Sequence, residues 1–155
     1  MDKDKSLREH VLELLEGKSA HIDLEAGLDG FPLDKVNEKP AGSPHSAWQL
    51  LEHIRIAQWD ILDFSRNPNY KEMKWPDDYW PKEDGTSARW NGSVERVLTE
   101  LQEMRDLVAD DKTDLFAKIP WGSGQTILRE ALLIADHNAY HLGQIVLMRR
   151  IFENS

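Results

Sequence analysis

The chain has 155 residues, of which 40% are hydrophobic and 30% are charged, so it is long enough for one domain with a hydrophobic core. Its net charge of −9 argues against nucleic-acid binding and against binding to anionic membranes, because both partners attract basic surfaces. The chain contains no cysteine, which excludes disulfides, thiolate metal ligands and cysteine nucleophiles.

No apolar run approaches the roughly 18 residues that a membrane-spanning helix needs. Residues 1–5 carry two aspartates and two lysines, and they lack the apolar core of a signal peptide. These features predict a cytoplasmic protein with no membrane partner and a single domain over residues 1–155.

Apolar residues recur at helical spacing over almost the whole chain. This pattern predicts helices over residues 6–16, 19–28, 46–65, 92–109 and 125–152, and the third of these begins either at Ser43-Pro44 or at Ser46. Ser46 and Gln49 have the spacing of a capping box at the start of the third of these helices. The last helix is apolar on nearly every side, which predicts a central, buried position.

The predicted connections are long. Residues 32–44 have room for one helical turn, and residues 110–124 form a second connection. The loop over residues 67–90 is rich in Trp, Tyr and Pro. A loop of this length is usually functional or disordered, and its aromatic residues argue against disorder. We therefore expect it to fold back over one end of the bundle. Four long helices with such connections predict an all-α fold, a four-helix bundle with crossover connections.

The histidines carry the strongest functional signal. His137 and His141 lie one turn apart on one helix face, and His53 lies on the apolar stripe of the helix over residues 46–65. Three imidazoles from two helices can hold one divalent metal ion and leave a coordination position open. The alternative is a set of core histidines that are satisfied by hydrogen bonds.

A site of three histidines suits nickel, zinc, copper or iron, because neutral imidazole binds all of them. The catalytic group would then be a metal-bound water or thiolate, and no catalytic side chain is assigned. The segment from His137 to His141 lacks the glutamate that follows the first histidine in zincin proteases, which argues against a metalloprotease.

Four further residues are candidates for second-shell or substrate-binding roles: His21, Asp136, Tyr140 and Gln144. His21 would reach the same cavity from the helix over residues 19–28, or be a partly buried helix residue. Asp136 would orient a histidine, or form a surface ion pair. Gln144 would hold a ligand or bind substrate; for Tyr140 the alternative is core packing.

Other polar and aromatic residues have simpler interpretations. His10 and His45 are predicted to be surface or capping residues, and Glu52 is predicted to lie on a solvated helix face. Trp75 and Trp80 either anchor the long loop or wall a ligand pocket.

Three segments resemble the DinB/YfiT-like superfamily of small four-helix-bundle proteins. They are residues 48–62 around His53, the loop Tyr79-Trp80-Pro81, and residues 125–144 around the histidine pair. The resemblance implies that His53, His137 and His141 bind a divalent metal ion, nickel or zinc. It also implies pairing through helices as a homodimer.

Some members of this superfamily are metal-dependent thiol S-transferases, which join a low-molecular-weight thiol such as bacillithiol or mycothiol to an electrophile. The resemblance therefore implies a small-molecule substrate and a role in detoxification or stress response. Two alternatives stay open: a metal-dependent hydrolase, and a non-catalytic metal- or ligand-binding stress protein.

Overall fold

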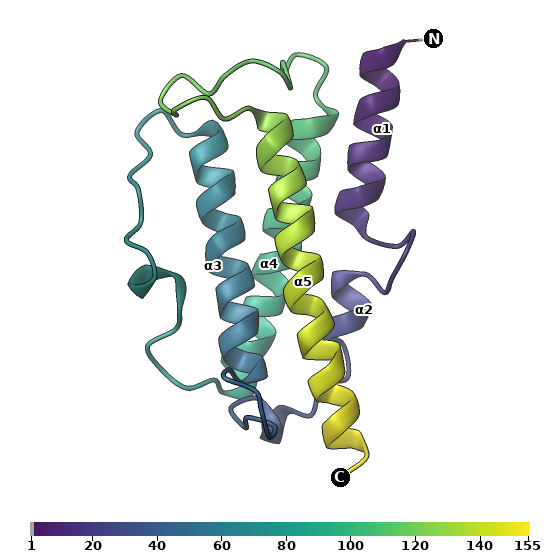
Figure 1. Ribbon diagram of the computed structural model, residues 1–155, viewed down its shortest axis with the longest axis vertical. Coiled ribbons are helices and arrows are strands. Elements are labelled where there is room, and N and C mark those ends of the chain that lie inside the picture. Colours follow the sequence, from purple (N-terminus) through teal and green to yellow (C-terminus); the bar gives the residue numbers. More distant parts are fainter. Residues whose placement is uncertain (1) are drawn as a thin grey trace.

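The computed structural model describes residues 2–155, which form an all-α bundle (Figure 1). Its α-helices are α1 (Lys3–Glu16), α2 (Leu24–Leu28), α3 (Ala47–Arg66), α4 (Ser87–Ala109) and α5 (Ile127–Glu153). Two short 3₁₀ turns are η1 (Leu33–Lys35) and η2 (Asp77–Tyr79). Over this described range there is no β-strand, and none of the helices is long and apolar enough to cross a membrane.

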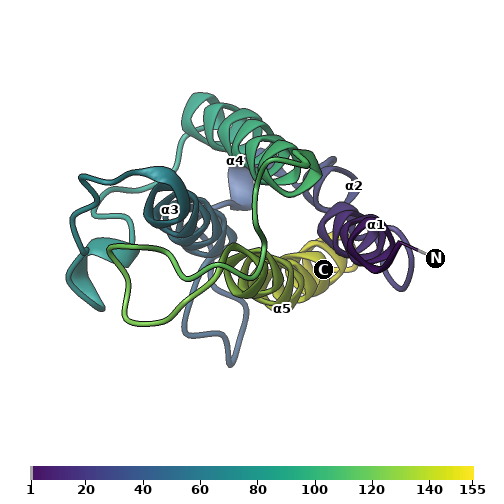
Figure 2. The same cartoon turned by 90° about the horizontal axis from the view of Figure 1, so that it is seen from above.

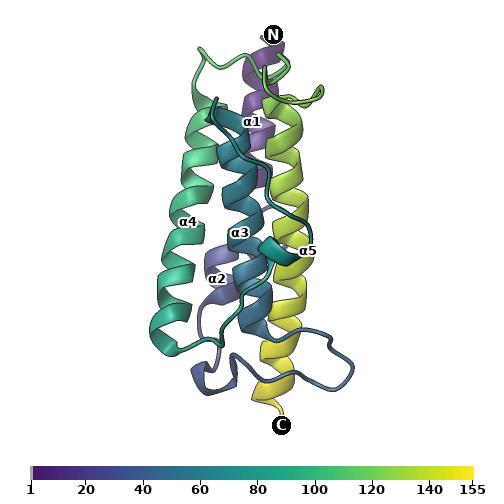
Figure 3. The same ribbon diagram turned by 90° about the vertical axis from the view of Figure 1, so that its left-hand side faces the viewer.

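The four long helices surround one core, with α1 and α3 each in contact with both α4 and α5 (Figure 2). In Figure 1, α1 and α5 run downward whereas α3 and α4 run upward. Because α3 and α4 are parallel, the chain between them must travel the length of the bundle. Residues 67–86, here called the strap, do so along the outer side of α3 (Figure 3). The predicted crossover is therefore confirmed, but the predicted position of this loop over one end is wrong.

The observed helix ends agree with the predicted ones at some positions and differ at others. The capping box of Ser46 and Gln49 starts α3 as predicted. The predicted helix over residues 19–28 is wrong in its first half. Gly17 ends α1 in the left-handed region (φ 77°), and the next helix, α2, begins only after Asp23, whose side chain caps it. Helix α4 begins at Ser87, before the predicted residue 92, because Thr86 caps it.

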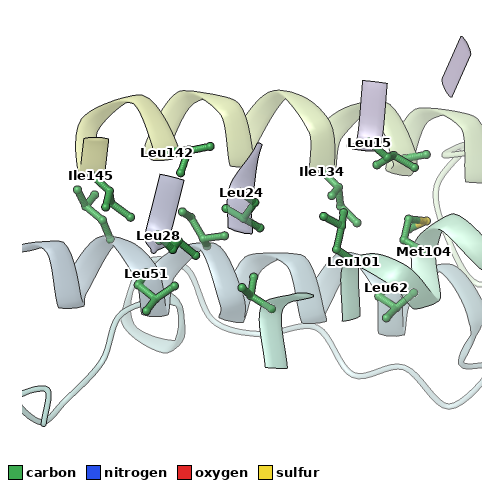
Figure 4. Packing of buried hydrophobic residues seen from close by; sticks show 14 of the residues in the cluster. Leu15, Leu24, Leu28, Leu51, Leu62, Leu101, Met104, Ile134, Leu142 and Ile145 are labelled. Atoms are coloured by element: carbon green, nitrogen blue, oxygen red, sulfur yellow. The ribbon is translucent and has the colours of Figure 1, made fainter. Parts of the chain in front are cut away.

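The core is a continuous layer of aliphatic side chains between the helices (Figure 4). Those that are almost inaccessible to solvent include Leu50, Leu51, Ile54 and Leu62 of α3, Val97 and Met104 of α4, and Ile134 and Ile145 of α5. The predicted central position of α5 is confirmed by its contacts with α1, α2, α3 and α4, but its predicted burial is only partly right, because one face of it exposes Leu132, Tyr140, Leu147 and Ile151.

Two buried polar contacts tie the helices together. The Arg8 guanidinium of α1 donates hydrogen bonds to the carbonyls of Val108 (2.7 Å), Asp110 (2.9 Å) and Thr113 (2.7 Å). These bonds pair carbonyls at the C-terminal end of α4 and in the loop that follows it.

The second contact joins α3, α4 and α5. The Gln58 amide donates to the Val97 carbonyl at 2.8 Å and accepts a hydrogen bond from Asn138 at 2.8 Å. Gln58 is only 1% exposed, so this chain of hydrogen bonds helps to fix the register of the three helices around the histidines.

Candidate metal centre

The structure brings the three predicted histidines together. His53 of α3 and His137 and His141 of α5 each offer one nitrogen, and these nitrogens all lie within 4.8 Å of one another. The two histidines of α5 are one turn apart, and α3 packs beside that face. His53 and His141 are buried and His137 is half-buried.

Hydrogen bonds fix the tautomers of two of these rings. The Nδ1 atom of His53 lies 2.9 Å from the Tyr79 carbonyl, and the Nδ1 atom of His141 lies 2.7 Å from the Gln144 Oε1 atom. Because both oxygens can only accept, both Nδ1 atoms carry the proton. The Nε2 atoms of His53 and His141 therefore keep their lone pairs. Metal-bound histidines typically donate their other ring N–H to such an oxygen.

The third ring is not satisfied by protein hydrogen bonds alone. The Nε2 atom of His137 lies 3.1 Å from the Nε2 atom of His53, and its buried Nδ1 atom has no hydrogen-bond partner within residues 2–155. The His137 Nε2 atom is therefore the nitrogen that faces the other two rings. Three imidazole nitrogens that converge, two of them with fixed lone pairs, fit a divalent metal ion.

The electrostatics favour the neutral, metal-binding form. Burial lowers the pKa of all three histidines. For His137, burial and repulsion from His141 and His53 lower the pKa to about 4. All three rings are therefore neutral at pH 7, the form in which imidazole binds a metal.

Aromatic rings cover the strap side of the cluster. The Trp80 indole stacks on His53, with ring centroids 4.0 Å apart and an interplanar angle of 2°. His45 stacks on Trp80 at 4.1 Å and so belongs to this surround, which the sequence prediction of a surface or capping residue missed. Trp75 lies farther out, 6.3 Å from His53.

Of the four other candidate residues, two lie beside the cluster and two make no contact with it. Gln144 holds His141, as described. Tyr140 is 67% exposed with its ring 4.8 Å from that of His141, so the core-packing alternative is wrong. Asp136 is exposed and makes no hydrogen bond or ion pair within the described part of the chain. His21 is exposed and bonds to the Ile22 carbonyl outside the cluster, because residues 18–23 are not helical.

The sequence analysis did not foresee the environment of two buried carboxylates on α3, Glu52 and Asp60. Glu52 is only 8% exposed, not on a solvated face; although burial favours its neutral form, hydrogen bonds from Arg55 and Ser93 hold its pKa below the ordinary value. Asp60 accepts hydrogen bonds from the hydroxyls of Tyr70 (2.9 Å) and Tyr79 (2.6 Å).

Tyr79 therefore joins the strap to α3 at two levels. Its carbonyl holds His53, and its hydroxyl holds Asp60 two turns along the helix. A cavity of about 600 Å³ opens beside this second contact, and Asp60, Tyr79 and Glu130 line it. Helical periodicity cannot reveal a backbone carbonyl from a loop, so no sequence signal pointed to this role.

Comparison with known proteins gives the family. The family model described as DinB superfamily matches residues 18–145, a range that holds all three histidines and the strap. The chain belongs to the DinB superfamily. Its bundle and its three-histidine cluster agree with this DinB assignment. Comparisons with curated proteins and with solved structures found no match.

Proposed function

We propose that this DinB protein is a divalent-metal-dependent enzyme, with nickel or zinc held by His53, His137 and His141. The observation that carries the proposal is the convergence of three neutral imidazoles, two of which have their Nδ1 protons fixed by Tyr79 and Gln144. Membership of the DinB superfamily supports it, because many members are metal-dependent enzymes.

We further propose that the reaction is the transfer of a low-molecular-weight thiol to an electrophile. A divalent ion at this position supplies Lewis acidity, which lowers the pKa of a thiol that it binds. The chain itself has no cysteine, so the sulfur must come from a cosubstrate. A sulfur lone pair forms the new S–C bond, the leaving group departs with the electrons of the bond that breaks, and the thiol proton passes to solvent.

The protein's own groups position these reactants. Gln144 and the Tyr79 carbonyl prevent His141 and His53 from rotating, so the ligand nitrogens keep their direction. The Trp80 indole covers one face of His53 and keeps water from that side of the cluster. The low pKa of His137 keeps the cluster neutral before a metal binds.

The first experiment is elemental analysis of protein purified without a histidine tag. We expect about one nickel or zinc ion per chain in the wild type and in His10→Ala, whose histidine is exposed on α1. We expect the metal to be lost in His53→Ala and His137→Ala. Full metal retention in both of these variants would refute the ligand assignment.

The second experiment separates the possible reactions. Loss of a haloarene electrophile in the presence of bacillithiol or mycothiol, abolished by chelation and by His137→Ala, would support thiol transfer. Turnover of an ester without thiol would favour a metal-dependent hydrolase instead. Bound metal with neither activity, and a large drop in melting temperature on chelation, would favour a non-catalytic metal-binding protein.

Self-association is a separate proposal, which rests on the resemblance to paired family members. Light scattering on the purified protein tests it, because a homodimer of this chain has twice the mass of the monomer.

A further inference from the structure

Two large aromatic side chains stand in solvent beside the histidine cluster. Trp75 of the strap and Tyr140 of α5 are each 67% exposed, and no other large hydrophobic side chain in the described residues is more exposed. The Trp75 ring lies 6.3 Å from that of His53, and the Tyr140 ring lies 4.8 Å from that of His141. The two most exposed rings of this protein therefore border the same cluster from two different elements.

Packing accounts for only part of this placement, because the Trp75 ring contacts the Tyr79 ring (centroids 5.3 Å apart) and the Tyr140 ring meets that of His141 edge to face. Neither residue belongs to the core, and within the described residues neither Trp75 nor Tyr140 donates a side-chain hydrogen bond. By contrast, the indoles of Trp48 and Trp121 each donate to a backbone carbonyl. Single exposed aromatic side chains are common, but two of them beside one cluster of metal-ligating side chains are a candidate for ligand recognition.

The indole of Trp80 is not free to contact a ligand in the same way. Trp80 already stacks on both His53 and His45, so its ring is committed to the protein. Trp75 is tilted by 57° to His53, and Tyr140 is at 76° to His141, so neither ring is stacked on its histidine. Both side chains keep 67% of their surface exposed, and this exposed surface can contact a ligand.

We propose that Trp75 and Tyr140 form a recognition rim for the aromatic body of a substrate whose donor atom reaches the histidine cluster. The substrate class is thus a planar aromatic compound with a metal-binding group. This inference rests on the proposed metal centre, and it adds which part of the substrate the protein selects. Each ring can meet a planar body by offset or edge-to-face contact, the arrangements that aromatic pairs prefer.

Two hydroxamates that share one metal-binding group test the rim: acetohydroxamate, which has only a methyl group, and benzohydroxamate, which has a phenyl ring. Calorimetric titration of the zinc-loaded protein gives the ratio of their dissociation constants. We expect the wild type to prefer benzohydroxamate by about tenfold, as one or two good aromatic contacts would provide. Trp75→Ala and Tyr140→Ala should each reduce this preference to about threefold.

Two controls define the origin of any change. Tyr140→Phe should keep the preference, because it keeps the ring. Phe116→Ala should also keep it, since Phe116 is a comparably exposed aromatic residue (62%) that does not contact the cluster. An unchanged ratio in both rim variants would overturn the proposal.

Failure of the rim is distinguishable from failure of the centre. Zinc content and binding of acetohydroxamate report on the three histidines, whereas the preference ratio reports on the rim alone. A wild type that holds zinc, binds acetohydroxamate and shows no preference would refute only the rim. A wild type that holds no zinc would refute both, because the rim acts on a metal-bound compound.

Discussion

Replacing Gln144 with methionine tests whether the hydrogen bond to His141 supports a metal ligand. The Gln144 Oε1 atom lies 2.7 Å from the His141 Nδ1 atom, and His141 is buried. Gln144→Met removes the acceptor but keeps side-chain length and helix propensity, so α5 should stay intact. Loss of such a second-shell partner typically weakens metal binding about 10- to 100-fold, or about 1.4 to 2.7 kcal/mol.

The assay is competition for zinc between the protein and a chromophoric chelator. Gln102→Met is the matched control, because Gln102 is exposed on α4 and bonds only to Asp106 and Arg105 on the same helix. We expect Gln102→Met to bind zinc like the wild type. A dissociation constant for Gln144→Met within threefold of the wild type would refute the supporting role.

Three further predictions concern stability. The pKa of His137 is lowered from 6.5 to about 4 in the folded protein, so between these values only the unfolded chain takes up the proton. The free energy of unfolding of the metal-free protein should therefore fall as the pH drops from 6.5 toward 4. Urea unfolding measures this fall, which should be smaller in His137→Gln. Gly85→Ala should cost about 1–3 kcal/mol by urea unfolding, because the new Cβ atom would lie 2.7 Å from the Trp48 ring; a loss below about 0.5 kcal/mol would contradict this. Gln58→Leu should lower the free energy of unfolding by about 1–3 kcal/mol, because it leaves the buried Asn138 amide unpaired. The double variant with Asn138→Leu should regain part of this stability, as measured by thermal unfolding.

The histidine cluster was predictable because helical periodicity determines which side chains share a face. The spacing of His137 and His141, and the apolar neighbours of His53, placed all three rings inward before any contact was known. Helical periodicity could not predict whether Tyr140 is buried or exposed. Helix α5 is apolar on almost every side, so its pattern could not tell the core face from the face that exposes Leu132 and Leu147.

The strap and its contacts lay beyond such a rule. Irregular segments have no periodicity, so nothing in the sequence said that the Tyr79 carbonyl would hold His53 or that Trp80 would stack on it. The error at His21 has a local cause. The apolar spacing continued past Gly17, but the left-handed conformation of Gly17 ended the helix and left His21 in a turn.

Arg8 bears on where the folding unit of this chain begins. The family resemblance starts at residue 18, so the whole of α1 lies outside it. Yet the Arg8 guanidinium closes the end of α4, and Val11 and Leu15 lie in the common core. A polypeptide reduced to the recognisable family region would leave those carbonyls unpaired and open the core to water. In this chain, the segment that matches the family model is therefore shorter than the segment that packs into the common core.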